Sequence, residues 1–283
     1  MTLYPHAGVA IAFSPRLDAL LAEAAPRLRY LAREITLIHV GAPSAKKELM
    51  LKESLRKAGL DEQMPIHWGR GTPHTAIIDA IRTREIDLLL LGALERERPI
   101  RYYMGSVAHN LVREAPCSLM LFTAPRKVPE RMSRITVVTD YSESALIALT
   151  RAQRLAEREG ADRLFVLRVL PKYGEAMAMA DGFGRQEAVV YQQSTIQEEG
   201  SLLQDFVDAA GHVEVPVEPH VVEGHPGPTV AHFVREHQVE LLAMPSSVGF
   251  GHIFERLFPS GMEWLLREIP CNLWVIRERL TSG

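Results

Sequence analysis

The sequence has little cysteine and no long apolar run. Its 283 residues include only two cysteines, Cys117 and Cys271, far apart in the chain. This usage excludes a disulfide scaffold or a zinc ribbon, and we expect both thiols to behave as small buried hydrophobic groups. No stretch approaches the roughly 18–20 apolar residues that cross a bilayer, and no cationic segment precedes the first apolar run. We therefore expect a cytoplasmic protein without a membrane span or signal peptide.

An excess of charge of one sign is also absent. The formal net charge is -3, which gives the whole chain no attraction for nucleic acid or for an anionic membrane. Hydrophobic residues make up 47% of the chain and charged residues 24%, which is typical of a globular protein with a proper core. The length is enough for two domains of ordinary size.

The chain repeats itself. Residues 105–122, GSVAHNLVREAPCSLMLF, correspond to residues 259–276, PSGMEWLLREIPCNLWVI, at an offset of 154. The beginnings of the two copies correspond at an offset of 127, which places Phe13 roughly opposite Asp140. The second copy therefore carries about 26 extra residues, around Pro171–Gln197. This insertion can form a lid or a partner surface, or pack on its own domain.

Each copy alternates short apolar runs with helical patterns. The predicted strands are 8–13, 35–40, 64–68, 87–91 and 118–122 in the first copy, and 134–139, 163–170, 215–222, 240–244 and 272–276 in the second. The predicted helices of the first copy are 16–32, 45–58, 73–84 and 106–114, and Pro26 should kink or shorten the first of them. This order predicts an α/β protein of two tandem, doubly wound, five-stranded parallel-sheet domains, 1–126 and 132–283, joined by the linker 123–134.

Ligands of doubly wound sheets bind at the carboxyl ends of the strands, where the strand order reverses. In the first copy the loop after the fourth strand begins at Gly92 and ends at Gly105 and Ser106. The glycines allow a sharp turn and a close backbone approach, and Ser106 with the free amides of the next helix suits an anion. The same Gly-Ser pair can also simply start a helix.

The spacing of this loop resembles that of the universal stress protein family, whose ATP-binding pattern is G-x2-G-x9-G-(S/T). Gly92, Glu95, Gly105 and Ser106 reproduce the spacing with one glycine replaced by glutamate, and GSVAHNLVREAPC resembles the family's final segment. The resemblance covers nearly the whole chain, twice. It implies the fold of the adenine-nucleotide alpha hydrolases with strand order 3-2-1-4-5, a stress-response role, ATP or another adenine nucleotide as ligand, and dimers formed through the last strand.

The resemblance also assigns residues at the ends of the first two strands. The family's aspartate that contacts the nucleoside matches Asp140, and the valine that lines the adenine slot matches Val40 and Val169. The first copy has no carboxylate at the aspartate position, and the second has Pro245 and Pro259 in its phosphate loop. Each copy therefore keeps a different half of the site.

Charged side chains crowd the first copy's loop. Glu95 would repel a triphosphate, whereas Arg96, Arg98 and Arg101 can offset it by pairing with Glu95 or by holding phosphate. The run is also compatible with a solvated loop. AMP is therefore as plausible a ligand as ATP.

The histidines His220, His225, His232 and His237 fit no standard metal-ligand spacing, so we expect no metal. We also expect no catalysis beyond a weak ATPase or pyrophosphatase activity, because no arrangement of base and nucleophile is visible. Two hypotheses remain: a regulatory protein that binds an adenine nucleotide, and a nucleotide-free scaffold or adaptor that acts through protein contacts. In either case the apolar strands SLMLF and NLWVI can pair within the chain, which leaves other faces for a homodimer or a protein partner.

Overall fold

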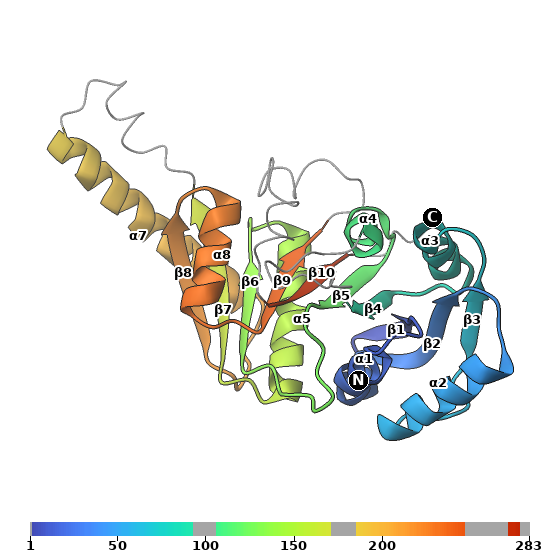
Figure 1. Cartoon of the computed structure of the whole chain (residues 1–283). Coiled ribbons are helices and arrows are strands. Elements are labelled where there is room, and N and C mark those ends of the chain that lie inside the picture. Colours follow the sequence, from blue (N-terminus) through green and yellow to red (C-terminus); the bar gives the residue numbers. More distant parts are fainter. Residues whose placement is uncertain (1, 93–105, 171–184, 247–270, 278–283) are drawn as a thin grey trace. The chain divides into compact units, whose positions relative to one another are not determined.

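A computed structural model describes residues 2–92, 106–170, 185–246 and 271–277, with the side chains of Ser106 and of residues 185–195 outside the description. The chain divides into two compact units. The first contains the described residues up to Arg131 together with Ser246 and residues 271–277, and the second contains Met132–Pro245. Figure 1 shows the elements of both units.

The first unit is a doubly wound sheet in the order β3-β2-β1-β4-β5-β10. Its strands are β1 (Tyr4–Ala10), β2 (Ala32–Val40), β3 (Ile66–Gly69), β4 (Leu88–Gly92), β5 (Ser118–Phe122) and β10 (Asn272–Ile276). The first five are parallel, and β10 runs antiparallel to β5. The predicted order 3-2-1-4-5 and the predicted pairing of SLMLF with NLWVI are confirmed.

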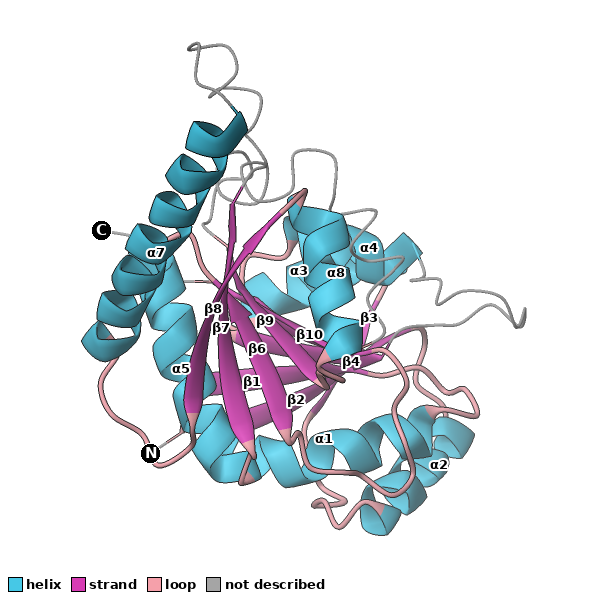
Figure 2. Cartoon of the chain, turned by 90° about the vertical axis from the view of Figure 1, so that its left-hand side faces the viewer, coloured by secondary structure: helices cyan, strands magenta, loops and turns pink. Residues whose placement is uncertain are grey.

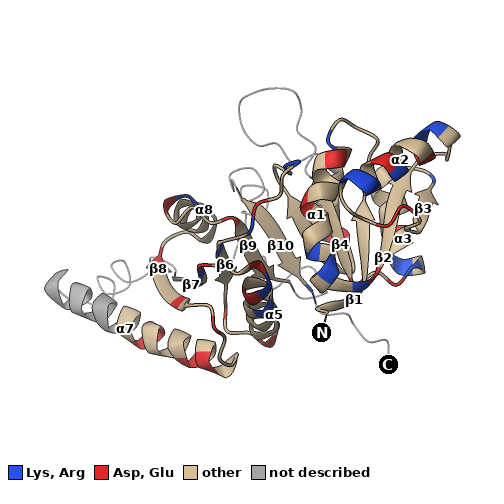
Figure 3. Ribbon diagram, turned by 90° about the horizontal axis from the view of Figure 1, so that it is seen from below, with Lys and Arg blue, Asp and Glu red and all other residues tan. Residues whose placement is uncertain are grey.

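The helices of the first unit lie on both faces of its sheet. Helices α1 (Leu17–Leu31) and α2 (Ala45–Lys57) contact each other on one face, and α3 (Pro73–Thr83) and α4 (Ser106–Glu114) contact each other on the other (Figure 1). Continuous apolar runs such as β4 are buried because both faces are covered. α2 shows solvent a mixed set of charged side chains and buries only Leu51, Ser54 and Leu55 (Figure 3).

The first helix corrects one expectation. α1 runs from Leu17 to Leu31 with Pro26 inside it, so the proline does not shorten it. Leu21, Leu28 and Leu31 of this helix are fully buried, and this packing outweighs the hydrogen bond that a proline removes. The strand before it also differs, because β1 ends at Ala10 and residues 11–13 lead into the helix.

A buried ion pair fastens the predicted linker to α1. The Arg27 guanidinium donates to the Glu23 carboxylate at 2.8 Å and to the carbonyl of Glu130 at 2.7 Å, and the Arg126 N–H donates to Glu23 at 3.2 Å. Arg27 is only 1% exposed. Such a pair is costly to break from one side, so residues 126–130 are held against the helix.

The second unit has a parallel sheet in the order β9-β6-β7-β8. Its elements are β6 (Arg134–Val138), α5 (Glu143–Glu159), β7 (Arg163–Leu170), α7 (Arg185–Ala209), β8 (Val217–Glu223), α8 (Pro226–Glu236) and β9 (Leu241–Pro245). Helices α5 and α7 cover one face and α8 the other (Figure 2). These strands follow the first four positions of the same order, whereas the fifth, β10, belongs to the first unit.

The second half of the predicted insertion is helical, because α7 begins at Arg185. Residues 171–184 lie outside the described part of the chain. The proposed domain boundaries, 1–126 and 132–283, stay a prediction.

Candidate functional site

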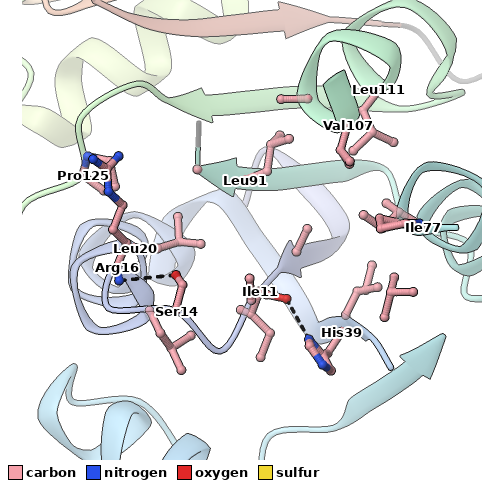
Figure 4. A pocket seen from close by; sticks show the side chains of 18 residues that line it. Ile11, Ser14, Arg16, Leu20, His39, Ile77, Leu91, Val107, Leu111 and Pro125 are labelled. Atoms are coloured by element: carbon pink, nitrogen blue, oxygen red, sulfur yellow. Dashed lines mark hydrogen bonds between the residues drawn. The ribbon is translucent and has the colours of Figure 1, made fainter. Parts of the chain in front are cut away.

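A cavity of about 210 Å³ lies at the carboxyl ends of β1, β2 and β4 in the first unit (Figure 4). The strand order reverses at β1, because β2 and β4 pair with its two sides and the connecting helices pass to opposite faces of the sheet. The connections that leave adjacent strands diverge here and leave a space between them, and the beginnings of α1, α3 and α4 form the remaining walls.

The walls of the cavity are mostly apolar. The nonpolar lining residues are Ala10, Ile11, Ala12, Leu17, Leu20, Ile38, Val40, Pro73, Ile77, Leu91, Gly92, Val107, Ala108, Leu111 and Pro125, and the polar ones are Ser14, Arg16 and His39. Figure 4 shows the labelled side chains converging from the strands and helices onto one space. An apolar cleft with a few polar groups suits a flat organic ring with a polar substituent.

The structure brings together several residues that the sequence singles out. Val40 and Gly92 both line the cavity, and α4 begins at Ser106 and contributes Val107 and Ala108. A methyl group at Gly92 would lie 3.6 Å from Leu20, an ordinary contact. The packing therefore does not demand glycine at this position, and a side chain there would point at a cavity wall.

The predicted phosphate loop, residues 93–105, lies outside the part of the chain that the structure describes. Gly105, Glu95 and the arginines Arg96, Arg98 and Arg101 lie outside the described residues, and so does the side chain of Ser106. In the second copy Pro259 lies outside them as well, whereas Pro245 ends β9.

His39 is a cavity residue that the sequence analysis missed. Its Nδ1–H donates to the carbonyl of Ile11 at 3.1 Å, and its Nε2 accepts from the Lys47 ammonium at 3.4 Å. Burial lowers the pKa of His39, and Lys47 lowers it further against the opposing effect of the Ile11 carbonyl. His39 is therefore a neutral imidazole in a fixed tautomer at neutral pH. A polar residue near the carboxyl end of an otherwise apolar strand, ITLIHV, is the sequence feature that indicates a position at the ligand-binding edge of the sheet.

An aromatic cluster surrounds His39. The rings of Phe13 and Trp68 are parallel within 10° with centroids 6.1 Å apart, and the His39 ring meets both edge-on. The Lys47 ammonium lies 5.7 Å from the centre of Phe13 and 5.8 Å from that of Trp68. The end of β2 is therefore surrounded by aromatic rings and a cation.

The hydrogen bonds of the sheets correct the alignment of the two copies by one residue. The N–H of Ile11 donates to the carbonyl of Ile38, between the first and second strands of the first unit. The N–H of Thr139 donates to the carbonyl of Leu167, between the first and second strands of the second unit. Ala12 therefore corresponds to Asp140, and Phe13 corresponds to Tyr141. The predicted correspondence of Phe13 with Asp140 is therefore shifted by one residue.

The two predicted residues of the second unit have local partners. The Asp140 carboxylate accepts from the N–H of Ser142 at 3.1 Å and from its hydroxyl at 2.5 Å. This contact also fixes Ser142, whose hydroxyl caps α5. Val169 is 3% exposed, whereas its counterpart Val40 is half-buried at the cavity.

Tyr141 connects the same turn to α7. Its backbone has a φ of 64°, and its hydroxyl donates to the Glu199 carboxylate at 2.8 Å. The Arg168 guanidinium lies 4.8 Å from the centre of the Tyr141 ring and 3.6 Å from Glu199. Burial and the hydrogen bond to Glu199 raise the pKa of Tyr141, so it remains a neutral donor.

Within the described ranges, no cluster of three histidine, cysteine, aspartate or glutamate side chains could hold a metal ion. Cys117 and Cys271 are both buried and are not joined in a disulfide. Of the helices that the structure describes, none is both long and apolar enough to span a membrane.

A fold with its cavity at this reversal point defines the class of doubly wound α/β proteins. The sequence profile of the universal stress protein family matches residues 42–123 and 132–277. The chain belongs to the universal stress protein family.

Solved structures match the chain over nearly its full length. A universal stress protein from Archaeoglobus fulgidus DSM 4304 is 16% identical with a TM-score of 0.65, and the match covers 96% of each chain. A protein from Pseudomonas aeruginosa UCBPP-PA14 is 14% identical with a TM-score of 0.66, covering 98% of this chain and 94% of that one. At these identities the likeness shows the fold. No curated protein sequence matches the chain significantly.

Proposed function

We propose that this chain is a stress-response regulatory protein that binds one adenine nucleotide in the cavity of its first unit and does not use it in metabolism. The observation that carries the proposal is the meeting of Val40, Gly92 and the beginning of α4 around that cavity. These are the positions that the family resemblance assigns to the adenine slot and to the ends of the phosphate loop.

The size and polarity of the cavity fit this ligand. A space of about 210 Å³ is below the roughly 300–1,000 Å³ of pockets that enclose drug-sized molecules. It suits an adenine ring with part of its sugar, and the phosphates would extend toward the N-terminus of α4. The first N–H groups of a helix have no partner within it and the helix dipole is positive at that end, so both favour an anion.

A second candidate function, as a nucleotide-free scaffold, is favoured by the second unit. Asp140 already has Ser142 as its partner, and Val169 is buried. We propose that nucleotide enters the first unit, and that Asp140 and Val169 mark a related place whose main role is structural. The edge of β5 is covered by β10, so a homodimer or a protein partner would use other faces.

The first experiment is to denature freshly purified protein and to identify and count released nucleotides by mass spectrometry. Calorimetric titration of the emptied protein with ATP, ADP and AMP then gives the affinity and the number of sites. We expect about one adenine nucleotide per chain and no steady release of phosphate beyond a trace. A protein that arrives empty and ignores all three nucleotides would establish the scaffold function instead.

Two variants locate the site. Val40→Trp fills the cavity from a half-buried position at the end of a strand, where an aromatic residue is tolerated. We expect it to weaken binding at least about a hundredfold, which corresponds to about 2.7 kcal/mol. Asp140→Asn, a change at the predicted nucleoside contact of the second unit, should leave the affinity within about twofold. The reverse pattern would place the nucleotide in the second unit.

A further inference from the structure

Arg277 directly follows β10 and is 4% exposed. Its guanidinium donates to the main-chain carbonyls of Val112, Ala115 and Cys117, the last at 3.3 Å, and to the hydroxyl of Ser246 at 3.3 Å. The buried guanidinium therefore uses several of its N–H donors in specific hydrogen bonds to carbonyl oxygens.

The carbonyls that Arg277 contacts lie at and just beyond the end of α4. The last four carbonyls of a helix have no partner within it, and this end carries the negative end of the helix dipole. A planar guanidinium satisfies several of these groups at once. Burial lowers the pKa of Arg277 to about 10, so the side chain stays charged at neutral pH.

The other end of the same helix lines the cavity. Val107, Ala108 and Leu111 are wall residues, and Ala108 and Leu111 are buried. α4 has 9 residues and is therefore only about 13 Å long. The backbone hydrogen bonds of so short a helix connect its two ends, so we expect a shift at its C-terminus to change the wall at its N-terminus.

The pairing of β10 with β5 sets the position of Arg277. The Ser118 hydroxyl at the start of β5 accepts from the N–H of Arg277 at 3.0 Å and donates to its carbonyl at 3.1 Å. At the other end of the pair, the Thr123 N–H donates to the Asn272 side chain at 3.1 Å. The fully buried Trp274 lies between these two contacts.

We propose that Arg277 is a positioning residue that couples the pairing of the C-terminal strand β10 to nucleotide binding in the cavity. When β10 is paired, Arg277 holds α4 where its first turns complete the cavity wall. When β10 separates from β5, α4 loses this anchor. Because coupling is reciprocal, a bound nucleotide in turn stabilises the pairing of β10 with β5. This inference rests on the proposed nucleotide site.

The test begins with the unaltered protein. Hydrogen–deuterium exchange is measured by mass spectrometry with and without a saturating adenine nucleotide. We expect the nucleotide to slow exchange at Leu273–Ile276, although these residues do not line the cavity. Unchanged exchange in this strand, in protein that demonstrably binds the nucleotide, would overturn the coupling and leave the proposed function intact.

Variants then assign the coupling to the side chain. Arg277→Met should weaken nucleotide binding about tenfold, within the usual range of coupling between sites, and should remove the protection of Leu273–Ile276. Arg277→Lys keeps a buried cation with fewer donors and should restore most of the affinity. Asn272→Ala removes one side-chain hydrogen bond at the other end of the pair but keeps the backbone pairing of Leu273–Val275 and the side chain of Arg277, so it should leave the affinity nearly unchanged.

The outcomes separate the two proposals. Equal nucleotide affinity in Arg277→Met and the unaltered protein would overturn the coupling alone. Failure of the unaltered protein to bind any adenine nucleotide would overturn the proposed function and the coupling together. If Arg277→Met does not fold, as judged by circular dichroism, the exchange measurement on the unaltered protein still decides the matter.

Discussion

The turn after β1 and the turn after β6 occupy equivalent places in the two units and carry different side chains. In the first unit the turn contains Ala12 and Phe13, and an apolar cavity begins beside it. In the second unit the turn contains Asp140 and Tyr141, and both side chains are engaged, one with Ser142 and the other with Glu199. An aromatic ring follows the strand in each case, and a cation lies over it in each case.

The difference shows that the same position in the fold can either line a cavity for a ligand or make packing contacts within its own unit. In the first unit the cation over the ring is Lys47, which comes from the helix after β2. Among the described residues of the cavity wall, the titratable side chains are Arg16 and the neutral His39. In the second unit Arg168 occupies the place of His39 and pairs with Glu199 of α7. The polar groups of the second turn therefore make contacts within their own unit, whereas the polar groups near the first turn line the cavity.

Among changes that exchange features between the two turns, the largest expected effect comes from giving the first turn the carboxylate of the second. Ala12→Asp places an acceptor at the edge of the cavity, on an exposed residue where the fold tolerates it. A hydrogen bond to a charged group contributes about 1.5–3 kcal/mol, so adenosine should bind at least about tenfold more tightly. Calorimetric titration measures the change, and 2′-deoxyadenosine serves as the matched ligand. No gain for either nucleoside would show that Ala12 does not border the nucleoside.

A smaller effect is expected from moving the phenol hydroxyl from Tyr141 of the second turn to Phe13 of the first. Tyr141→Phe removes the hydrogen bond to Glu199, and we expect a loss of about 1 kcal/mol of unfolding free energy because the group is only half-buried. Phe13→Tyr should change the stability by less than about 0.5 kcal/mol. Urea unfolding of both variants measures the two values. Equal losses would mean that the tie between the second turn and α7 contributes nothing specific.

The smallest effect is a pH dependence that distinguishes the second unit. His220 packs against Phe165, Phe233 and His237, and burial lowers its pKa, with His237 adding to the effect and Glu218 opposing it. A histidine with a lowered folded pKa binds its proton more weakly when folded. Its stabilising contribution is therefore complete above its unfolded pKa of about 6.5 and is lost as the pH falls below it.

Exchange or urea unfolding of the second unit between pH 7.5 and 5.5, roughly one unit either side of that pKa, measures this loss. His220→Phe should flatten the dependence, whereas the same change at the exposed His212 should leave it as it is. A His220→Phe variant with an unaltered pH profile would assign the dependence to other groups, among them His39 in the first unit.

The predictable part of the fold is the part that depends on local pattern. The apolar runs predict every strand of the first unit, and the bounds 106–114 match α4 because Ser106 and Pro116 mark its two ends. The start of β1 was missed because Tyr4 and His6 interrupt the apolar pattern, although Tyr4 is buried against Trp274. Such a contact between residues far apart in the sequence is set by topology.

The candidate site divides in the same way. Val40 and Gly92 were found because a strand end and a glycine are local features. His39, Lys47 and Trp68 were not, because their contact depends on three separate elements meeting at one edge of the sheet. Arg277 was missed for a related reason, since an arginine near a chain end normally indicates a solvated side chain, and only the end of α4 explains its burial.

The antiparallel partner of β5 also has a consequence for synthesis. Thr123 and Asn272, which are hydrogen bonded, stand 149 residues apart, so the ribosome makes the first unit long before it makes the strand that completes it. At about 5–20 residues per second this interval lasts roughly 7–30 s. During that time the apolar edge of β5 is an open template for another strand. A nascent chain of this protein therefore has a period in which a chaperone, or the β5 of a neighbouring nascent chain, competes with its own β10.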